Sequence, residues 1–141
     1  LREDLIDKLT FERLYKGKHI LDESYKNAKI KKKELTQNIH DLLENFDILI
    51  TPTNFDLPFN LGDISQINKY YMRHARSPFN VSGNPAISVP CGLSKTNLPI
   101  GFQIVGRYNA DQFISDIAHD FLIKTDWENI RKKNIIKNLF L

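Results

Sequence analysis

Several features that would mark a specialised class of protein are absent from this sequence or scarce in it. There is a single cysteine, Cys91, so an internal disulfide is impossible and an oxidising compartment gains no support. No apolar run approaches the roughly 18 to 20 residues that cross a bilayer, which excludes a membrane span. The four histidines are scattered, without the spacing of metal ligands. We therefore expect a cytoplasmic protein that holds no metal and no cofactor.

The N-terminus lacks an initiator methionine, and it also lacks the basic head and apolar run of a signal peptide. We therefore expect a fragment or a processed product of a longer protein. The 141 residues suffice for one domain but not for two. Hydrophobic residues make up 41% and charged residues 26%, which is typical of a soluble globular protein.

The positive charge is not spread over the chain, although the net charge is +3. Residues 1–46 carry ten basic and nine acidic side chains, residues 47–127 carry six and seven, and residues 128–141 carry four and one. The imbalance therefore equals the contribution of a short tail. A nucleic-acid interface needs charge clustered over a folded face, so we expect no nucleic-acid partner.

Hydrophobic periodicity predicts two helices before any strand. The first covers residues 2–14 and ends before Gly17. Asp22 is the predicted N-cap of a longer second helix, which runs to Phe46. The apolar stripe of this second helix comprises Tyr25, Ala28, Leu35, Ile39, Leu42 and Phe46.

The middle of the chain alternates between strands and a helix. Residues 46–53 predict a buried strand that Pro52 ends, because proline has no N–H to donate. A helix from Ser65 to Arg76 follows, and Pro78 breaks it. Two further strands are predicted at residues 86–90 and 99–106, paired as a hairpin.

The last predicted helix follows Asn109 and Gln112, which resemble a capping box. Its apolar positions are Phe113, Ile114, Ile117, Ala118, Phe121 and Leu122. The complete order is helix, helix, strand, helix, strand, strand, helix. This order indicates an α/β fold with too few strands for a complete sheet.

Residues 77–85 read SPFNVSGNP and run directly into a predicted strand. Two prolines, one glycine and two asparagines predict a tight, irregular loop at this point. Loops held by a rigid sheet commonly carry functional sites. The alternative is a purely structural connection.

Three blocks of sequence together resemble the C-terminal part of the amidase signature family. They read FDILITPT at 46–53, PFNVSGNPAISVPCG at 78–92 and LPIGFQIVG at 98–106. The resemblance covers about residues 14–127. It implies an α/β protein that forms the C-terminal portion of the amidase signature fold, with a mixed sheet covered by helices and incomplete in this chain. Residues 1–127 would be the C-terminal segment of an amidase domain, and residues 128–141 a basic and apolar tail.

The same resemblance implies an activity, the hydrolysis of a carbon–nitrogen amide bond to a carboxylate and ammonia or an amine. Members of the family use a serine nucleophile, a bridging serine held by a cis peptide, and a lysine. A hydroxyl is a weak nucleophile at neutral pH, so its proton must pass to a neutral lysine. Prearranged backbone donors then stabilise the oxyanion.

The Gly/Ser-rich segment that such chemistry requires is not found in this sequence. The six glycines are scattered, and no serine lies in a Gly/Ser-rich run. We therefore name no catalytic residue and expect the triad on a missing N-terminal part, which would be this chain's main partner. On this interpretation the chain alone is inactive. A non-catalytic binding or assembly module of the same fold remains the alternative from another functional class.

Candidate substrate-binding residues are carried over from the resemblance. Thr51 and Thr53 precede a turn expected near the reacting centre, and Phe79 is expected to form an apolar wall of the cleft for a small-molecule amide. Asn80 and Asn84 are either substrate-facing amides or amides that fix the loop through its own backbone.

Arg73 and Arg76, three residues apart on one predicted helical face, either recognise an anionic group or are plain surface charges. Arg73 also bears on the subfamily. The related tRNA-dependent amidotransferase, in its A subunit, typically carries an acid near this position. The arginine therefore favours a free-standing amidase here, and the amidotransferase remains the alternative. Three interpretations of the tail stay open: it packs on the missing part, mediates a homodimer, or frays.

Overall fold

A small antiparallel sheet lies at the centre of the molecule. The computed structural model describes residues 5–60, 62–70 and 73–139. Within them, strands β1 (Leu49–Pro52), β2 (Ala86–Leu93) and β3 (Pro99–Val105) form one sheet in the order β1-β3-β2. The predicted hairpin is confirmed, because β2 and β3 pair antiparallel around the turn that joins them. The α/β class is confirmed as well, although the strands described here are all antiparallel and the expected mixed pairing does not occur among them.

Successive side chains of β3 lie on opposite faces of the sheet, as in any pleated strand. Ile104 packs with Val89 of β2, and Val105 packs on the other face. Both are fully buried. The predicted buried strand at 46–53 is shorter than expected and lies at an edge, where Ile50 is 61% exposed because β1 has β3 as its sole neighbour in the described sheet.

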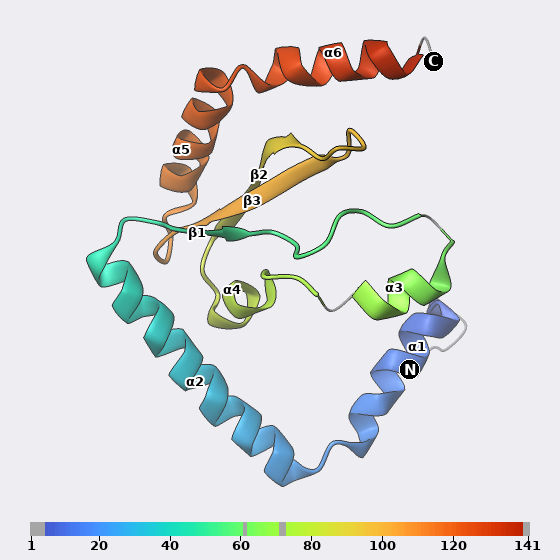
Figure 1. The fold of residues 1–141 in the computed structure, drawn as a ribbon. Helices are drawn as coiled ribbons and strands as arrows, with labels where there is room; N and C mark the ends of the chain where they lie inside the picture. Colours follow the sequence, from blue (N-terminus) through green and yellow to red (C-terminus); the bar gives the residue numbers. More distant parts are fainter. Residues whose placement is uncertain (1–4, 61, 71–72, 140–141) are drawn as a thin grey trace.

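Helices cover both faces of the sheet (Figure 1). On one face, helix α5 (Asp111–Lys124) buries Ile114 and Ala118 against β2 and β3. On the other, helices α2 (Asp22–Asn45) and α4 (Ser77–Ser82) pack around Val105. The predicted apolar face of α5 is confirmed apart from Phe113, which is 46% exposed. The predicted capping box is wrong: Ala110 is the N-cap residue and makes no side-chain capping bond.

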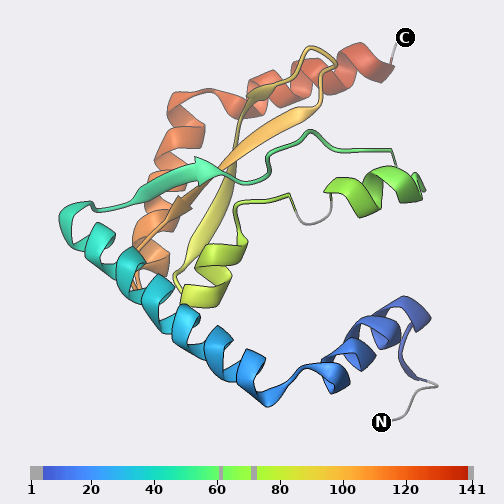
Figure 2. The ribbon, with the colours of Figure 1, turned by 60° about the horizontal axis from the view of Figure 1, so that its bottom comes forward.

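The N-terminal helices form an arm that projects from the sheet (Figures 1 and 2). The arm comprises α1 (Lys8–Lys16), the short 3-10 helix η2 (Gly17–His19) and the first half of α2, where every side chain from residue 22 to residue 34 is exposed. The predicted N-cap at Asp22 is wrong, because Leu21 takes that position and Asp22 begins the helix.

The predicted stripe of α2 is confirmed at Leu35 and Ile39, which pack in the core, but it is wrong at Leu42. Ile39 and Leu43 are buried, whereas the predicted core residue Leu42 is 48% exposed. Tyr108 helps to hold this helix, because its ring packs edge-on against His40 at 4.5 Å and its hydroxyl donates a hydrogen bond to the carbonyl of Ser82.

The segment between β1 and β2 differs most from expectation. Helix α3 (Ile64–Tyr70) ends six residues before the predicted Arg76. The predicted irregular loop at 77–85 instead contains α4, because Pro78 occupies the first turn, where a helix needs no N–H from it. Gly83 then ends α4 in the left-handed region at φ 84°, which glycine adopts without steric cost.

A further helix, α6 (Trp127–Leu139), follows α5 after a break at Asp126, whose φ is +52°. None of the described helices is both long and apolar enough to span a bilayer.

Candidate functional site

The chain segment that follows β1 lies beside the segment that precedes α4. The backbone N–H of Phe55 donates to Arg73 O at 3.3 Å, and that of Ala75 donates to Thr53 O at 3.2 Å. Asn54 and His74 form an isolated antiparallel bridge between these two bonds. Residues 53–55 and 73–75 therefore behave as a short two-stranded ribbon that continues from the sheet, and we call them the ribbon.

Gln103 of β3 connects the ribbon to the sheet. Its side chain is buried, with 2% exposure. Its Nε2 donates to Thr51 Oγ1 at 2.8 Å, to Ala75 O at 3.0 Å and to Pro52 O at 3.4 Å. A buried amide that satisfies acceptors on two separate segments fixes their relative position, because leaving any of these groups without a partner is costly.

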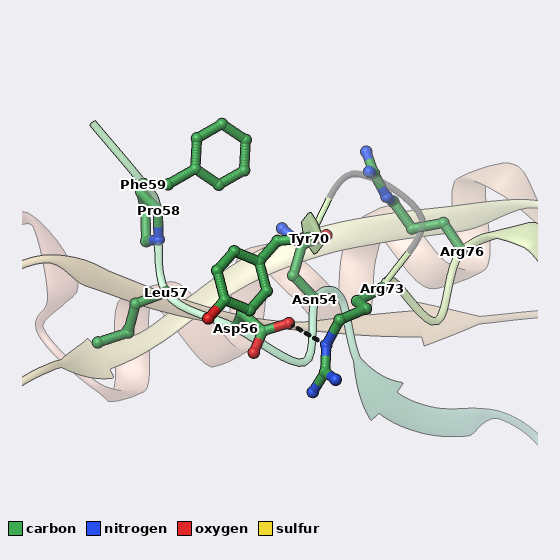
Figure 3. Close-up of a pocket in the computed structure, with 8 residues that line it drawn as sticks. All are labelled: Asn54, Asp56, Leu57, Pro58, Phe59, Tyr70, Arg73 and Arg76. Atoms are coloured by element: carbon green, nitrogen blue, oxygen red, sulfur yellow. Dashed lines mark hydrogen bonds and ion pairs between the residues drawn. The ribbon is translucent and has the colours of Figure 1, made fainter. Parts of the chain in front are cut away.

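A pocket of about 280 Å³ opens between the ribbon and α3 (Figure 3). We call it the arginine pocket. It is lined by Asn54, Asp56, Leu57, Pro58, Phe59, Tyr70, Arg73 and Arg76.

The charges of the arginine pocket do not balance. Arg73 Nε donates to Asp56 Oδ2 at 2.7 Å, and its guanidinium carbon lies 5.8 Å from the centre of the Tyr70 ring. Figure 3 shows Arg73 turned toward Asp56, whereas the guanidinium of Arg76 extends away from this pair. Within the described part of the chain, the Arg76 guanidinium has neither a hydrogen-bond nor an ion-pair partner. One carboxylate and two guanidinium groups leave the pocket with a net positive charge.

A second pocket, of about 490 Å³, is lined by residues 53–58 together with residues of β2 and β3. Its polar feature is a pair of hydroxyl groups, Thr53 Oγ1 and Ser88 Oγ, 2.9 Å apart. Around this pair the lining is mainly apolar, with Pro90 of β2 and Ile100 of β3 among the residues. We call it the hydroxyl pocket. The two pockets share the loop after β1, so a molecule in either would contact that loop.

The candidate substrate-binding residues do not all lie at these pockets. Thr53 lines the hydroxyl pocket and Arg73 lines the arginine pocket, while Thr51 lines neither of them and accepts the bond from Gln103. Phe79 packs in the core with Ile39, Leu43 and Val105, and it is 7% exposed.

The two asparagines differ in environment. Asn84 is buried: its Nδ2 donates to Gly106 O at 2.9 Å, and its Oδ1 accepts from Ser82 Oγ at 2.7 Å. Of the two alternatives for Asn84, these bonds correspond to the loop-fixing role. Asn80 is exposed on α4.

The predicted placement of Arg73 and Arg76 on one helical face is wrong, because α3 ends at Tyr70 and both arginines follow it. They nevertheless line the same pocket.

Comparison with known proteins identifies the family of this chain. The family model described as Amidase matches residues 1–114, which is most of the chain. The chain belongs to the amidase family. The resemblance stated from the three sequence blocks is therefore confirmed, and the last part of α5 and all of α6 lie beyond the matched residues.

Curated relatives within the amidase family include the A subunits of glutamyl-tRNA(Gln) amidotransferases. The one from Dehalococcoides mccartyi strain 195 is 42% identical over 95 residues, which are 66% of this chain and 19% of that protein. The protein of the same description from Brevibacillus brevis is 34% identical over 116 residues, 77% of this chain and 24% of its own length. The chain therefore spans about a fifth to a quarter of the length of these relatives.

Solved amidase structures share the fold. The A subunit of the glutamyl-tRNA(Gln) amidotransferase from Thermotoga maritima is 30% identical, with a TM-score of 0.56 over 78% of this chain and 26% of its own. A bacterial aryl acylamidase of the amidase signature family is 24% identical, with a TM-score of 0.74 over 88% of this chain and 27% of its own. The second likeness concerns the fold alone.

The amidase sequence pattern did not reveal several residues that shape the two pockets. Each of three residues forms a hydrogen bond with a partner that is distant in sequence: Asp56, Ser88 and Gln103. For Gln103 there was one local signal, since it is the single polar residue in the apolar run of β3.

The described residues contain no group of three or more histidine, cysteine or acidic side chains that could hold a metal ion. On α6, a hydrogen bond from Lys132 and the charge of this lysine lower the pKa of the Glu128 carboxyl group. Glu128 lies outside both pockets.

Proposed function

We propose that the protein to which this chain belongs hydrolyses a carbon–nitrogen amide bond, releasing a carboxylate and ammonia or an amine. Membership of the amidase family supports this proposal. The serine nucleophile, the bridging serine and the lysine would lie on the part of the protein outside this chain. On this view the chain contributes one wall of the substrate cleft and no catalytic residue.

We infer that the surface formed by this chain orients the substrate. Hydrolysis needs the scissile amide to be held in one orientation while a hydroxyl attacks it, and a rigid surface supplies that orientation at little entropic cost. Gln103 fixes the ribbon against β1, so Asn54, Asp56 and Arg73 are presented from a stiff base. The small-molecule amide would lie along the loop that the two pockets share.

The observation that favours a free-standing amidase is the arginine at position 73. An A subunit of the amidotransferase type would present an acid near this position to the amine of its amide donor. Here the guanidinium forms an ion pair with Asp56 at 2.7 Å and lies near the ring of Tyr70, so the Asp56 carboxylate is already engaged and position 73 offers no free acid. A donor with a cationic amine therefore finds no free carboxylate at this position, whereas an amide without such an amine needs none.

A second candidate function is that of the A subunit of a glutamyl-tRNA(Gln) amidotransferase. The observation in its favour is the 42% identity to a protein of that description. In that case the ammonia released by amide hydrolysis would attack the side-chain carboxyl group of glutamyl-tRNA(Gln) after ATP has activated that group as an acyl phosphate, so that phosphate leaves and the ammonia is not lost to solvent.

One assay separates the two candidates. The protein that contains this chain is incubated with a panel of simple amides, and ammonia release is measured with and without glutamyl-tRNA(Gln) together with ATP. Turnover of amides without tRNA supports the free-standing amidase. Formation of glutaminyl-tRNA(Gln) as the main activity supports the second candidate. If neither reaction occurs, both are refuted and a non-catalytic binding module is favoured.

A pair of variants tests the part that this chain plays. Arg73→Met removes a charge from the arginine pocket, and Lys124→Met removes one from the exposed end of α5. We expect kcat/KM for amides to fall about tenfold in the first variant, as for loss of one charged hydrogen bond, and to stay unchanged in the second. Equal activities would show that the arginine pocket does not contact the substrate.

A further inference from the structure

Arg76 is the one guanidinium of the arginine pocket whose charge no described group neutralises. Arg73, which lines the same pocket, is already paired with Asp56. Arg76 lies directly before α4, in a backbone conformation that two N–H groups of that helix fix by donating to its carbonyl, those of Phe79 and Asn80 at 3.2 Å. The base of the side chain is thus anchored, while its charged end is free to bind a ligand.

The surroundings of Arg76 point to the chemistry of that ligand. A guanidinium presents a planar fork of donors that matches a carboxylate, and such pairs are stronger and more directional than hydrogen bonds between neutral groups. The remaining lining is largely apolar, from Leu57, Pro58, Phe59 and the ring of Tyr70. A ligand that fits this lining has a negatively charged end and an apolar body.

Charge near the pocket reinforces the preference for an anion. Lys69 Nζ lies 5.1 Å from the centre of the Tyr70 ring, and Arg73 approaches the same ring. Asp56 is the one acidic residue among those that line the pocket, and its carboxylate is engaged by Arg73. The potential that an entering ligand meets is therefore positive.

We propose that the arginine pocket is a carboxylate subsite, in which Arg76 binds a carboxylate at the end of the substrate remote from the scissile amide. This proposal rests on the proposed amidase function and names its substrate class: amides whose far end carries a carboxylate on a short apolar chain. Arg76 is a binding and specificity-determining residue in this scheme and takes no part in bond cleavage.

The test compares paired substrates on the protein that contains this chain. Each primary amide carries a carboxylate two to six methylene groups from the amide, and each is matched by its uncharged methyl ester. The measured quantity is the ratio of kcat/KM for acid over ester. We expect this ratio to fall about tenfold in Arg76→Ala, to recover in part in Arg76→Lys, and to be unchanged in the control Lys124→Ala. An unchanged ratio in Arg76→Ala overturns the proposal.

A further variant should change the acid-to-ester ratio of kcat/KM in the opposite direction. Asp56→Asn removes the acidic side chain that lines the pocket and frees Arg73 for a second contact. For an anionic ligand the ratio of acid to ester should rise in this variant. A fall in the ratio would show that loss of the Asp56 charge does not favour an anion in the pocket, and would refute a carboxylate subsite.

Failure of the subsite can be told from failure of the amidase function. Binding of adipate, a dicarboxylate without an amide, is measured by calorimetry on wild type and on Arg76→Ala, whether or not turnover is seen. Weaker adipate binding in the variant supports the subsite even in a protein that hydrolyses no amide. Turnover of amides together with equal adipate binding in both proteins refutes the subsite and leaves the amidase function standing.

Discussion

Replacing Gln103 by methionine should loosen the ribbon that carries both pockets. Methionine has nearly the shape of glutamine and no donor, so the substitution removes the hydrogen bonds and little else. The carbonyl of Ala75 loses a bond of 3.0 Å, and Thr51 Oγ1 loses one of 2.8 Å. Because an unsatisfied buried polar group costs about 1–3 kcal/mol and the Thr51 hydroxyl can turn to another partner, we expect local destabilisation of about 2 kcal/mol.

Native-state hydrogen exchange measures this effect where it arises. The reporter is the N–H of Ala75, which donates to Thr53 O across the ribbon. A cost of about 2 kcal/mol predicts exchange roughly thirtyfold faster in Gln103→Met. The control is Gln112→Met on the exposed surface of α5, where the amide bonds Asp116 of the same helix and exchange at Ala75 should not change. Unchanged exchange at Ala75 in Gln103→Met would refute the role given to Gln103.

A glutamate at position 103 adds a pH dependence with a definite sign. Burial disfavours the charged form, so the pKa of this carboxyl group in the folded protein is raised above its unfolded value of about 4.3. The folded state then holds the proton more tightly than the unfolded state. Stability of Gln103→Glu should be greatest below the unfolded pKa and should fall as the pH rises toward the folded pKa. Stability that increased over this range would contradict the burial of the side chain.

Two further variants test the loop and the turn beyond β3. Asn84→Ala should lower the stability of the protein by about 2–3 kcal/mol in urea unfolding, because the amide bridges two buried groups, while exposed Asn80→Ala should leave it unchanged. If activity per folded molecule falls in Asn84→Ala without a loss of stability, Asn84 contacts substrate and is not a loop-fixing residue. Gly106→Ala would place a Cβ 2.7 Å from Ile114 Cγ2 and should cost about 1–3 kcal/mol, whereas Gly92→Ala meets nothing within 4 Å. Equal unfolding midpoints for the two alanine variants would contradict the close packing of α5 on the end of β3.

The elements that the sequence predicted well are those with a strong local pattern. The β2–β3 hairpin follows from two apolar runs and a polar turn, and α5 follows from its repeated apolar positions. These features depend on neighbours within a few residues. The end of the α2 stripe shows the limit of this reasoning: Leu42 and Leu43 are equally apolar, and the packing against Val105 decides which is buried.

Pro78 shows a second limit of local patterns. Its position in the sequence predicts the end of a helix and the start of a loop, yet it lies in the first turn of α4, where its missing N–H has no cost. Proline ends one helix and begins another with the same covalent geometry, and the six residues of α4 give too little periodicity to choose.

The two pockets depend on contacts that no local pattern records. Gln103 and Ala75 are 28 residues apart, and Asp56 and Arg73 are 17 apart. The resemblance to amidases drew attention to Thr53 and Arg73, but only the folded chain shows that Asp56 pairs with one arginine and leaves the other unneutralised.

The strand order has a consequence for the biosynthesis of this chain. β3 is the last of the three strands to be translated, and it is the one that holds the other two together. When β1 leaves the ribosome, its neighbour still lies more than forty residues downstream. At about 5–20 residues per second, β1 therefore waits for several seconds with its backbone groups unpaired. β1 has only four residues, and one of them, Pro52, has no N–H. Such a short strand is a poor template for pairing with other chains during this interval.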